Sequence, residues 1–272
     1  MSFSAEWLAL REPYDRAARN AAVLDAVAGA FREKPAIAVV DLACGTGATL
    51  RAIGPQLPAQ QTWRLTDNDL SLLARAPSAS GGRPGGRPLT VITRPVDLAR
   101  DLELALEPPL DLITTSALLD LVSTEWLDRL IIEAAARRLP VYAALSYDGR
   151  AVIEPAVAGD DEVLAGFNRH QLTDKGFGPA LGPQAAARAI ERFAHFGYDL
   201  VQGRSDWVFG TDDRPIQEML FASWAELAPL TTALSEQSIA QWLDRRRAHL
   251  AAGVSRLRIG HVDIFARPIG TR

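Results

Sequence analysis

The chain has 272 residues, of which 48% are hydrophobic, and this is enough for one large domain with a substantial core. The formal net charge is −4 and no broad basic field is present, which argues against a nucleic-acid-binding surface. The single cysteine, Cys44, excludes an intrachain disulfide and a cysteine-rich zinc site, and no apolar run approaches the ~20 residues that span a bilayer.

The first half of the chain alternates between predicted helices and predicted strands. Short apolar runs are typical of buried parallel strands, and segments with helical spacing lie between them. We expect helices over residues 16–31, 48–54, 69–76 and 125–138, and strands over 36–40, 62–66, 89–93, 111–115 and 141–146. Residues 77–88 are rich in Gly and Pro and are expected to form an exposed, flexible loop. The alternation predicts an α/β fold with a doubly wound, mostly parallel sheet.

The second half departs from this alternation. The expected elements are a helix over 184–196, extended segments at 198–202 and 206–209, helices over 214–228 and 236–251, and a final strand at 257–265. The polar stretch 166–179 is short of helix signals and is expected to be a long functional loop, since its two phenylalanines argue against disorder.

The most informative stretch is V-V-D-L-A-C-G-T-G at residues 39–47. An apolar run ends at Asp41, a glycine-rich turn follows, and a helix-compatible segment comes next. Such glycines let the backbone approach a ligand closely, and the following helix points its positive N-terminal end at that ligand. We therefore interpret the turn as a cofactor cradle. A dinucleotide fingerprint, G-x-G-x-x-G, is incomplete here, because Leu50 occupies the position of its third glycine.

The run D-L-A-C-G-T-G resembles the first motif, D/E-x-x-x-G-x-G, of class I S-adenosylmethionine-dependent methyltransferases. In that family the glycines lie under the methionine and adenosine parts of the cofactor, and the acidic residue anchors the turn near the cofactor's amino group. The resemblance covers roughly residues 36–148 by motif and implies a Rossmann-like sheet of seven strands, the last of them antiparallel. It also implies S-adenosylmethionine as the cofactor and methyl transfer as the reaction.

Four polar residues, Asp41, Asp67, Asp97 and Ser116, each follow the end of a predicted strand. Right-handed crossovers bring the carboxyl ends of parallel strands to one edge, so these side chains should converge there. A carboxylate at Asp67 can accept hydrogen bonds from both ribose hydroxyls, which suits either a nicotinamide cofactor or S-adenosylmethionine. The resemblance places Asp97 near the adenine amino group and Ser116 near the methionine end, and an ordinary helix N-cap is the alternative for both.

The N-terminal segment, residues 1–31, is expected to form a helical lid over the cofactor, as it does in many relatives. Arg19 could pair with the methionine carboxylate in bidentate fashion, and a solvated helix face is the alternative. The complete set of expected cofactor-binding residues is Asp41, Ala43, Gly45, Gly47, Asp67, Asn68, Asp97, Leu98, Ser116, Tyr14 and Arg19.

The acceptor pocket is expected from two insertions, 149–182 and 211–255, above a cofactor-binding core of residues 36–148 within a single domain of residues 1–272. His170 is the candidate general base, because the unperturbed pKa of imidazole lies near neutrality. Arg246 falls on the apolar face of its helix and needs an anionic partner, which is either a substrate carboxylate or phosphate or an internal acidic residue. The expected substrate-binding residues are Asn168, Arg169, Lys175 and Arg246.

Methyl transfer from a sulfonium is an in-line displacement in which the enzyme chiefly aligns donor and acceptor. A base is needed only if the acceptor must lose a proton early, so no metal site is expected. The loop at 115–118 is not of the N/D-P-P-Y/F type found in resembling amino-methyltransferases of nucleic acids and glutamine. Together with the acidic charge, this favours a small-molecule acceptor over nucleic acid, and the acceptor would be anionic if Arg246 binds it.

Two other functions stay open. An S-adenosylmethionine-binding protein could use the same cradle without methyl transfer, and a nicotinamide-dependent oxidoreductase would favour six parallel strands. Residues 1–20 are charged and mixed in character, unlike a signal peptide, which indicates a cytoplasmic protein with no membrane partner. The sequence leaves the oligomeric state and the identity of the acceptor open.

Overall fold

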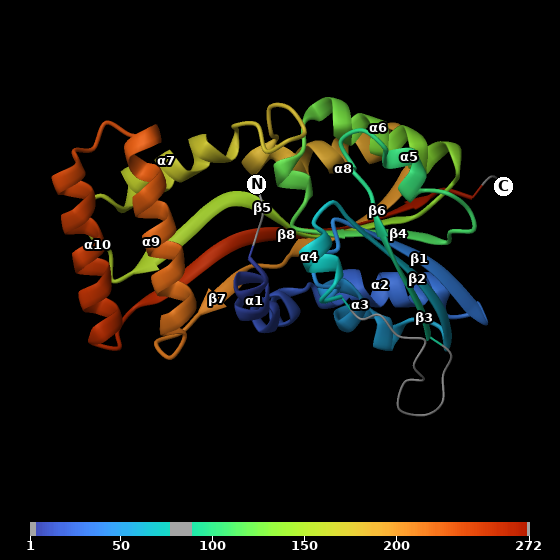
Figure 1. Ribbon diagram of the computed structural model, residues 1–272, viewed down its shortest axis with the longest axis horizontal. Coiled ribbons are helices and arrows are strands. Elements are labelled where there is room, and N and C mark those ends of the chain that lie inside the picture. The colour runs from blue at the N-terminus through green and yellow to red at the C-terminus, as the bar shows by residue number, and fades with distance from the viewer. Residues whose placement is uncertain (1–3, 77–88, 271–272) are drawn as a thin grey trace.

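The computed structural model describes residues 4–76 and 89–270, and the loop expected at 77–88 lies outside the described residues. Figure 1 shows an elongated molecule with a twisted sheet between helices at one end. Two strands of this sheet continue to the other end, where a separate group of helices packs on them.

The strands form one sheet. Their bounds are β1 Ala36–Leu42, β2 Gln60–Asp67, β3 Leu89–Pro95, β4 Leu112–Ser116, β5 Val141–Glu154, β6 Tyr198–Arg204, β7 Trp207–Phe209 and β8 Arg256–Pro268. The order is β3-β2-β1-β4-β5-β8-β6, with β7 paired to β8. Strands β1 to β5 run parallel, whereas β8 is antiparallel to β5, β6 and β7. The expected doubly wound, mostly parallel sheet is confirmed, and within the described chain the three-residue β7 adds an eighth strand to the expected seven.

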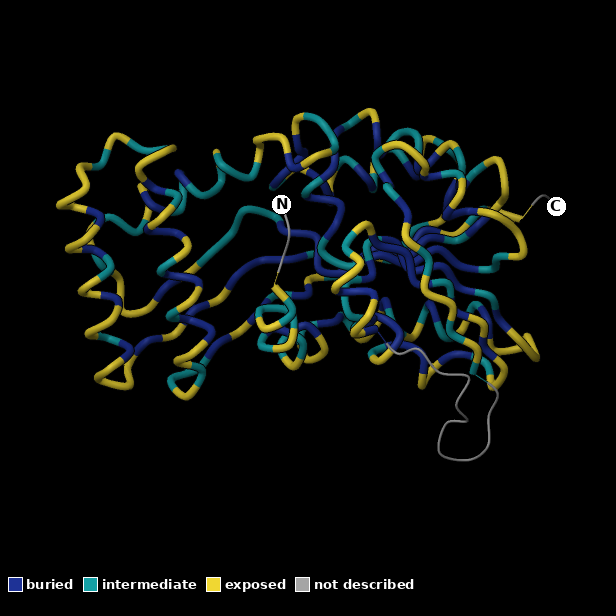
Figure 2. The backbone as a smooth tube through the Cα atoms, viewed as in Figure 1, coloured by how far each residue is buried: buried dark blue, intermediate teal, exposed yellow. Residues whose placement is uncertain are grey.

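Helices cover both faces of the parallel strands (Figure 1). The helices are α1 Ala5–Ala18, α2 Ala21–Phe31, α3 Ala48–Ile53, α4 Leu70–Leu73, α5 Leu102–Ala105, α6 Thr124–Ala136, α7 Asp160–Gln171, α8 Ala185–His195, α9 Arg214–Thr231 and α10 Glu236–Ala251. Alternation along β1 explains the two layers, because Val40 and Leu42 join the core under α5, α6 and α8 while Ile37 and Val39 join the core under α2 and α3. Figure 2 shows the central strands buried and the outer turns of the helices exposed. None of the helices in residues 4–76 and 89–270 is long and apolar enough to cross a membrane.

The helix expected over residues 16–31 is instead two helices, α1 and α2, which meet at Asn20. Asn20 caps α2 by accepting the backbone N–H of Val23 at 3.1 Å, and its own backbone N–H donates to Asp263 Oδ2 at 3.0 Å. The apolar spacing continues across this break, but the cap and the bond to β8 hold the backbone of Asn20 out of the helix.

Strands β5 and β8 continue beyond the parallel strands as a bulged antiparallel ribbon, on which α7, α9 and α10 pack around a third apolar core. The expectation of a loop over 166–179 is wrong in its first part, because residues 166–171 are the last turns of α7. Gly166 obscures the helical pattern. A Cβ at this position would lie 2.4 Å from Thr232 Cγ2, so glycine permits the close approach of α7 to the end of α9.

Arg246 is fully buried between α10 and α7, and its anionic partner is internal. Its guanidinium forms an ion pair with Asp160, to which its Nε donates at 3.1 Å, and its Nη1 donates to the Pro155 carbonyl at 2.8 Å. Trp242 Nε1 donates to the same Asp160 carboxylate at 2.8 Å. The expectation that Arg246 binds the acceptor is therefore corrected, because Asp160 already satisfies its charge.

Replacing Arg246 by Met should lower the free energy of unfolding by about 3 kcal/mol, because Asp160 would lose its cation within a largely buried contact. Urea unfolding followed by tryptophan fluorescence measures this change. The matched control is Arg247→Met, which removes a half-exposed arginine paired with Glu218 and should cost less than about 1 kcal/mol. Equal losses in the two variants would contradict the structural role of Arg246.

Candidate active site

The turn after β1 has an unusual backbone. Ala43, Gly45 and Gly47 have φ values of 52°, 53° and 80°, which lie in the left-handed region. The turn is fastened to β2 because the backbone N–H of Cys44 donates to the Thr66 carbonyl at 2.9 Å. A Cβ added at Gly45 would lie 3.0 Å from Leu8 Cδ1 of α1. The glycine therefore keeps free a narrow surface between the turn and α1.

Asp67 ends β2 and faces this turn. Its Oδ2 accepts the backbone N–H of Gly45 at 2.9 Å, and its Oδ1 accepts the backbone N–H of Asp69 at 3.0 Å. The two bonds fix the orientation of the carboxylate, and an ionised carboxylate has further lone pairs that can accept from a ligand.

The turn and Asp67 border a cleft of about 700 Å³ at the carboxyl edge of the sheet, which we call the edge cleft. Segments after β1, β2, β3 and β4 form its floor and walls, α1 covers it, and residues after α7 close one end. Its lining includes Leu8, Arg11, Asp15, Ala43, Gly45, Asp67, Asn68, Asp97, Leu98, Ser116, Ala117, Leu121 and Lys175. Seven of the expected cofactor-binding residues thus meet in one cleft, namely Ala43, Gly45, Asp67, Asn68, Asp97, Leu98 and Ser116.

Asp41 lies beneath the edge cleft, and it is fully buried. Its Oδ1 accepts from Thr114 Oγ1 at 2.8 Å, whereas its Oδ2 has no hydrogen-bond partner in the described part of the chain. Burial raises the pKa of Asp41 to about 7, and the charge of Asp67 adds to the rise, while Thr114 and Arg19 oppose it. Asp41 therefore supports the turn from beneath, and its carboxyl group stays protonated up to about neutral pH.

Arg19 and Tyr14 do not border the edge cleft, which corrects their expected role in cofactor binding. Arg19 is buried and donates to Tyr142 Oη at 2.9 Å and to Ser116 Oγ at 3.4 Å, so it reaches the cleft only through Ser116. Tyr14 donates to Asp213 Oδ1 at 2.8 Å. Gly47, the N-cap of α3, lies outside the cleft lining as well. The break at Asn20 explains the error for Arg19, because this residue follows the last turn of α1 rather than facing outward from a helix.

Arg11 and Asp15, rather than Arg19, are the charged residues of the N-terminal segment that line the edge cleft. Arg11 Nε donates to Asp15 Oδ2 at 2.9 Å, and the guanidinium carbon lies 5.0 Å from the centroid of the Trp207 ring. Trp207 Nε1 donates to Asp15 Oδ1 at 2.9 Å. The i, i+4 spacing of Arg11 and Asp15 on a helix is the sequence signal that could have indicated this pair.

A second cavity of about 360 Å³, the aromatic cavity, adjoins the edge cleft, because Arg11, Ala117 and Leu121 line both. Its walls come from α1, the loop after β4, the β5–β8 ribbon, β7, α7 and α9. Its lining includes Trp7, Arg11, Asp120, Leu145, Tyr147, Phe167, His170, Trp207, Leu220, Ser223, Trp224, Leu227, Ile259 and His261. The two segments that were expected to form an acceptor pocket, 149–182 and 211–255, contribute only through α7 and α9.

The expected acceptor residues are mostly placed elsewhere. Asn168 accepts from Tyr147 Oη at 2.7 Å, and Arg169 Nε donates to the Thr231 carbonyl at 2.7 Å, so both make internal contacts. Lys175 lines the edge cleft, and its Nζ donates to the His170 carbonyl at 2.9 Å. His170 does line the aromatic cavity, where burial and the charge of Lys175 lower its pKa.

Asp120 is the buried acidic group of the aromatic cavity, and sequence reasoning missed it. It lies in the short 3₁₀ helix Leu119–Leu121 after β4, and its Oδ1 has no hydrogen-bond partner among the described residues. Burial raises its pKa to about 6, although backbone hydrogen bonds, including one from Tyr147, and the charge of Arg11 oppose the rise.

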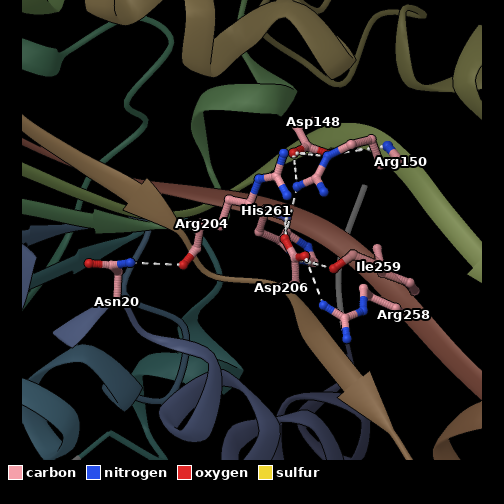
Figure 3. A network of polar contacts seen from close by, with 8 residues as sticks. All are labelled: Asn20, Asp148, Arg150, Arg204, Asp206, Arg258, Ile259 and His261. Atoms are coloured by element: carbon pink, nitrogen blue, oxygen red, sulfur yellow. Dashed lines mark hydrogen bonds and ion pairs between the residues drawn. The ribbon is translucent and has the colours of Figure 1, made fainter. Parts of the chain in front are cut away.

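His261, which lies on β8, is a second polar residue in the lining of the aromatic cavity. Its Nδ1 lies 3.2 Å from the Ile259 carbonyl, and burial lowers its pKa to about 3. Because a carbonyl can only accept, Nδ1 carries the proton and Nε2 has a free lone pair. Figure 3 shows the charged groups that support this strand: Asp206 accepts the backbone N–H of His261 at 3.3 Å and Arg150 Nη2 at 2.9 Å, and it lies 3.8 Å from Arg258.

No protein-family model matches the chain, and a search of curated proteins finds no significant match. Solved structures do align with most of it. The YcgJ protein from Bacillus subtilis covers 92% of this chain and 100% of its own at 13% identity and a TM-score of 0.48. The cyclopropane synthase MmaA2 from Mycobacterium tuberculosis covers 90% and 83%, at 14% identity and a TM-score of 0.46. The mycolic acid cyclopropane synthase CmaA1, in complex with SAH and CTAB, also covers 90% and 83%, at 12% identity and a TM-score of 0.46.

The strand order decides between the two types of nucleotide-binding sheet. A dinucleotide-binding sheet has six parallel strands in the order 3-2-1-4-5-6. Here antiparallel β8 stands between β5 and β6, and the buried Leu50 replaces the third glycine of the dinucleotide fingerprint. The sheet therefore has the arrangement that the resemblance to class I S-adenosylmethionine-dependent methyltransferases implies, mostly parallel with one antiparallel strand, β8, beside β5. In this fold the edge cleft lies over the motif at Asp41–Gly47, and the aromatic cavity lies beside it.

The stability of the protein should depend on the protonation of Asp41. Its pKa rises from an ordinary 3.8 to about 7 on folding, so between these pH values the folded protein holds a proton that the unfolded chain releases. The contribution of Asp41 to the free energy of unfolding therefore falls as pH rises through this window, by up to ~1.4 kcal/mol per pH unit. Urea unfolding of the wild type and of Asp41→Asn from pH 4 to 8, without ligand, measures the difference.

The free energy of unfolding of the wild type, measured relative to that of Asp41→Asn, should be greater at pH 4 than at pH 8. Asp25→Asn, which removes an exposed carboxylate of α2, controls for loss of charge alone. A difference between wild type and Asp41→Asn that stays constant with pH would contradict a buried, protonated Asp41.

Proposed function

We propose that this protein transfers a methyl group from S-adenosylmethionine to a small-molecule acceptor. The observation that carries the proposal is the junction of two separately walled cavities at Arg11, Ala117 and Leu121. Methyl transfer needs a donor and an acceptor held next to each other and in line, and two adjoining sites that share three lining residues suit that need.

The residues of the edge cleft fit the cofactor. Gly45 leaves a surface that a side chain would fill against Leu8, and Asp67 has lone pairs free for the two ribose hydroxyls. Asp97 and the apolar Leu98 would border the adenine, and Ser116 with Arg11 would border the methionine end. When bound, S-adenosylmethionine supplies an electrophilic methyl group on a positively charged sulfur.

The charges of the edge cleft favour this cofactor further. Asp15, Asp67, Asp69 and Asp97 bring four carboxylates to the lining, against the two cations Arg11 and Lys175. Net negative charge attracts a sulfonium, and Leu8, Arg11 and Asp15 of α1 cover part of the cleft. The protein's part is chiefly to orient the two ligands and to exclude water between them.

Replacing Asp67 by Ala should weaken binding of S-adenosylmethionine and of S-adenosylhomocysteine at least ~10-fold, because hydrogen bonds from the ribose hydroxyls to a charged acceptor are lost. Isothermal titration calorimetry with each ligand measures the change, and circular dichroism checks that the variant is folded.

The matched control is Asp199→Ala, which removes an exposed carboxylate of β6 paired with Arg267 and should leave both affinities as they are. Absence of binding of either ligand to the wild-type protein would refute the proposed function. Binding of S-adenosylmethionine without methylation of any component of a cell extract would favour a cofactor-binding role instead.

A further inference from the structure

We propose that the aromatic cavity recognises its acceptor through an ammonium group, which donates a hydrogen bond to His261 Nε2 and whose positive charge is held by the ring-lined walls and by the negative charge of Asp120. This inference rests on the proposed function, because it names the class of acceptor. A protonated amine has no lone pair, so this group serves recognition rather than receiving the methyl group. The supporting features are a free acceptor atom, a set of aromatic rings and an excess of carboxylates.

The free acceptor atom is His261 Nε2. The Ile259 carbonyl, 3.2 Å from Nδ1, fixes the proton on Nδ1, so Nε2 presents a lone pair. Nε2 forms no hydrogen bond with the described residues, and it is not among their unpartnered atoms that lack accessible surface. Because His261 lines the aromatic cavity and is otherwise buried, this surface faces the cavity. Burial lowers the pKa of His261 to about 3, so Nε2 stays an acceptor at neutral pH.

The walls of the cavity carry five aromatic side chains, Trp7, Tyr147, Phe167, Trp207 and Trp224. The faces of such rings carry negative potential and attract cations. Trp207 already holds one, since the guanidinium carbon of Arg11 lies 5.0 Å from its ring centroid. Phe167 packs against Tyr147 and Trp224, with centroids 5.6 Å and 5.4 Å away, so these three rings form one wall. The volume of about 360 Å³ is near the lower end for ligand sites and suits a compound of one or two rings.

The charges around the cavity leave a negative excess. Burial raises the pKa of Asp120 to about 6, so this carboxyl is largely ionised at pH 7 and above. The positive charge of Arg11 favours the ionised form, but the same guanidinium already pairs with Asp15 at 2.9 Å. One guanidinium thus serves two carboxylates. Asp120 needs no direct contact with the ligand, because a buried charge is weakly screened and acts across the cavity wall.

The same balance disfavours an anionic acceptor. Arg246, which favoured one in the sequence, is engaged with Asp160, and Lys175 lines the edge cleft rather than the aromatic cavity. Together the two linings hold five carboxylates, four in the edge cleft and that of Asp120, against the cations Arg11 and Lys175. This excess suits two positively charged groups side by side, the sulfonium of the cofactor and the ammonium of the acceptor.

Binding without cofactor tests this inference separately from the proposed function. The probes have one ring and a side chain of similar size: phenethylamine is positively charged near neutral pH, phenethyl alcohol is a neutral donor, and phenylacetate is negatively charged. Isothermal titration calorimetry with the wild-type protein at about pH 7.5 should show phenethylamine binding at least ~10-fold more tightly than phenethyl alcohol, and phenylacetate binding most weakly.

The first variant is Asp120→Asn, which keeps the size of the side chain and removes its charge. It should bind phenethylamine at least ~10-fold more weakly than the wild type and phenethyl alcohol equally well, because only a charged ligand senses the loss. Circular dichroism checks that the variant is folded. Asp199→Asn, which removes an exposed carboxylate of β6, is the matched control and should change neither affinity.

The second variant is His261→Phe, which removes Nε2 but keeps a ring in contact with Tyr147 and Trp207, whose centroids lie 6.0 Å and 4.8 Å from that of His261. Both phenethylamine and phenethyl alcohol should bind roughly 3- to 10-fold more weakly, because both donate a hydrogen bond. The preference for phenethylamine should stay. The two variants therefore separate the charge from the hydrogen bond, and both residues line the aromatic cavity and not the edge cleft.

Four results would overturn the inference: no binding of phenethylamine to the wild type at millimolar concentration, binding of phenethyl alcohol or phenylacetate as tight as that of phenethylamine, a preference for phenethylamine that survives in Asp120→Asn, or unchanged affinities in His261→Phe. Each can occur while S-adenosylhomocysteine still binds the wild type, so failure of this inference is distinct from failure of the proposed function.

Discussion

The pairing of β5 with β8 beyond the parallel strands is the constraint on which the aromatic cavity depends. A sheet that ended with its parallel strands would offer no surface there for further helices. The ribbon instead carries Tyr147 and His261 past that edge and gives α7 and α9 an apolar surface on which to pack. β7 pairs with the same ribbon and adds Trp207. The aromatic cavity is therefore a product of tertiary pairing rather than of any one segment, and it lies beside the edge cleft because α1 and the segment after β4 line both.

Helix α1 is held to this ribbon by charge and by aromatic contact together. Arg11 stacks on Trp207, and Asp15 accepts from both the guanidinium and the indole N–H. Tyr14 donates to Asp213 at the start of α9. Because Arg11, Asp15 and Trp207 are buried, loss of Asp15 would take the carboxylate acceptor from both the guanidinium and the indole N–H. The same contacts set Arg11 at the junction, so the side chain that fastens the helix also borders both cavities.

The parallel core could be predicted from the sequence because its signals are local. Strand ends are visible as the ends of apolar runs, so Asp67, Asp97 and Ser116 can be assigned to one edge without coordinates. The acceptor side could not be predicted in this way, since its geometry comes from contacts between distant segments. Trp207 and Asp15 are separated by 192 residues. Arg246 pairs with Asp160, which lies 86 residues away on α7, and Gly166 makes that helix hard to recognise in the sequence. Asp120 carries no motif at all, and only the burial of its carboxyl group, with Oδ1 unpartnered among the described residues, distinguishes it from a surface aspartate.

The placement of α1 has a consequence for the two cavities. Leu8 and Asp15 face the edge cleft, Trp7 faces the aromatic cavity, and Arg11 faces both. Helix α1 thus covers both the edge cleft and the aromatic cavity, and Leu8 lies so close to the turn that a Cβ at Gly45 would press against it. A ligand in either cavity would contact the same helix, so a change in the packing of α1 would alter both binding surfaces together. The hydrogen bond from Trp207 to Asp15, which fixes α1 on the ribbon, thereby couples the shapes of the two cavities.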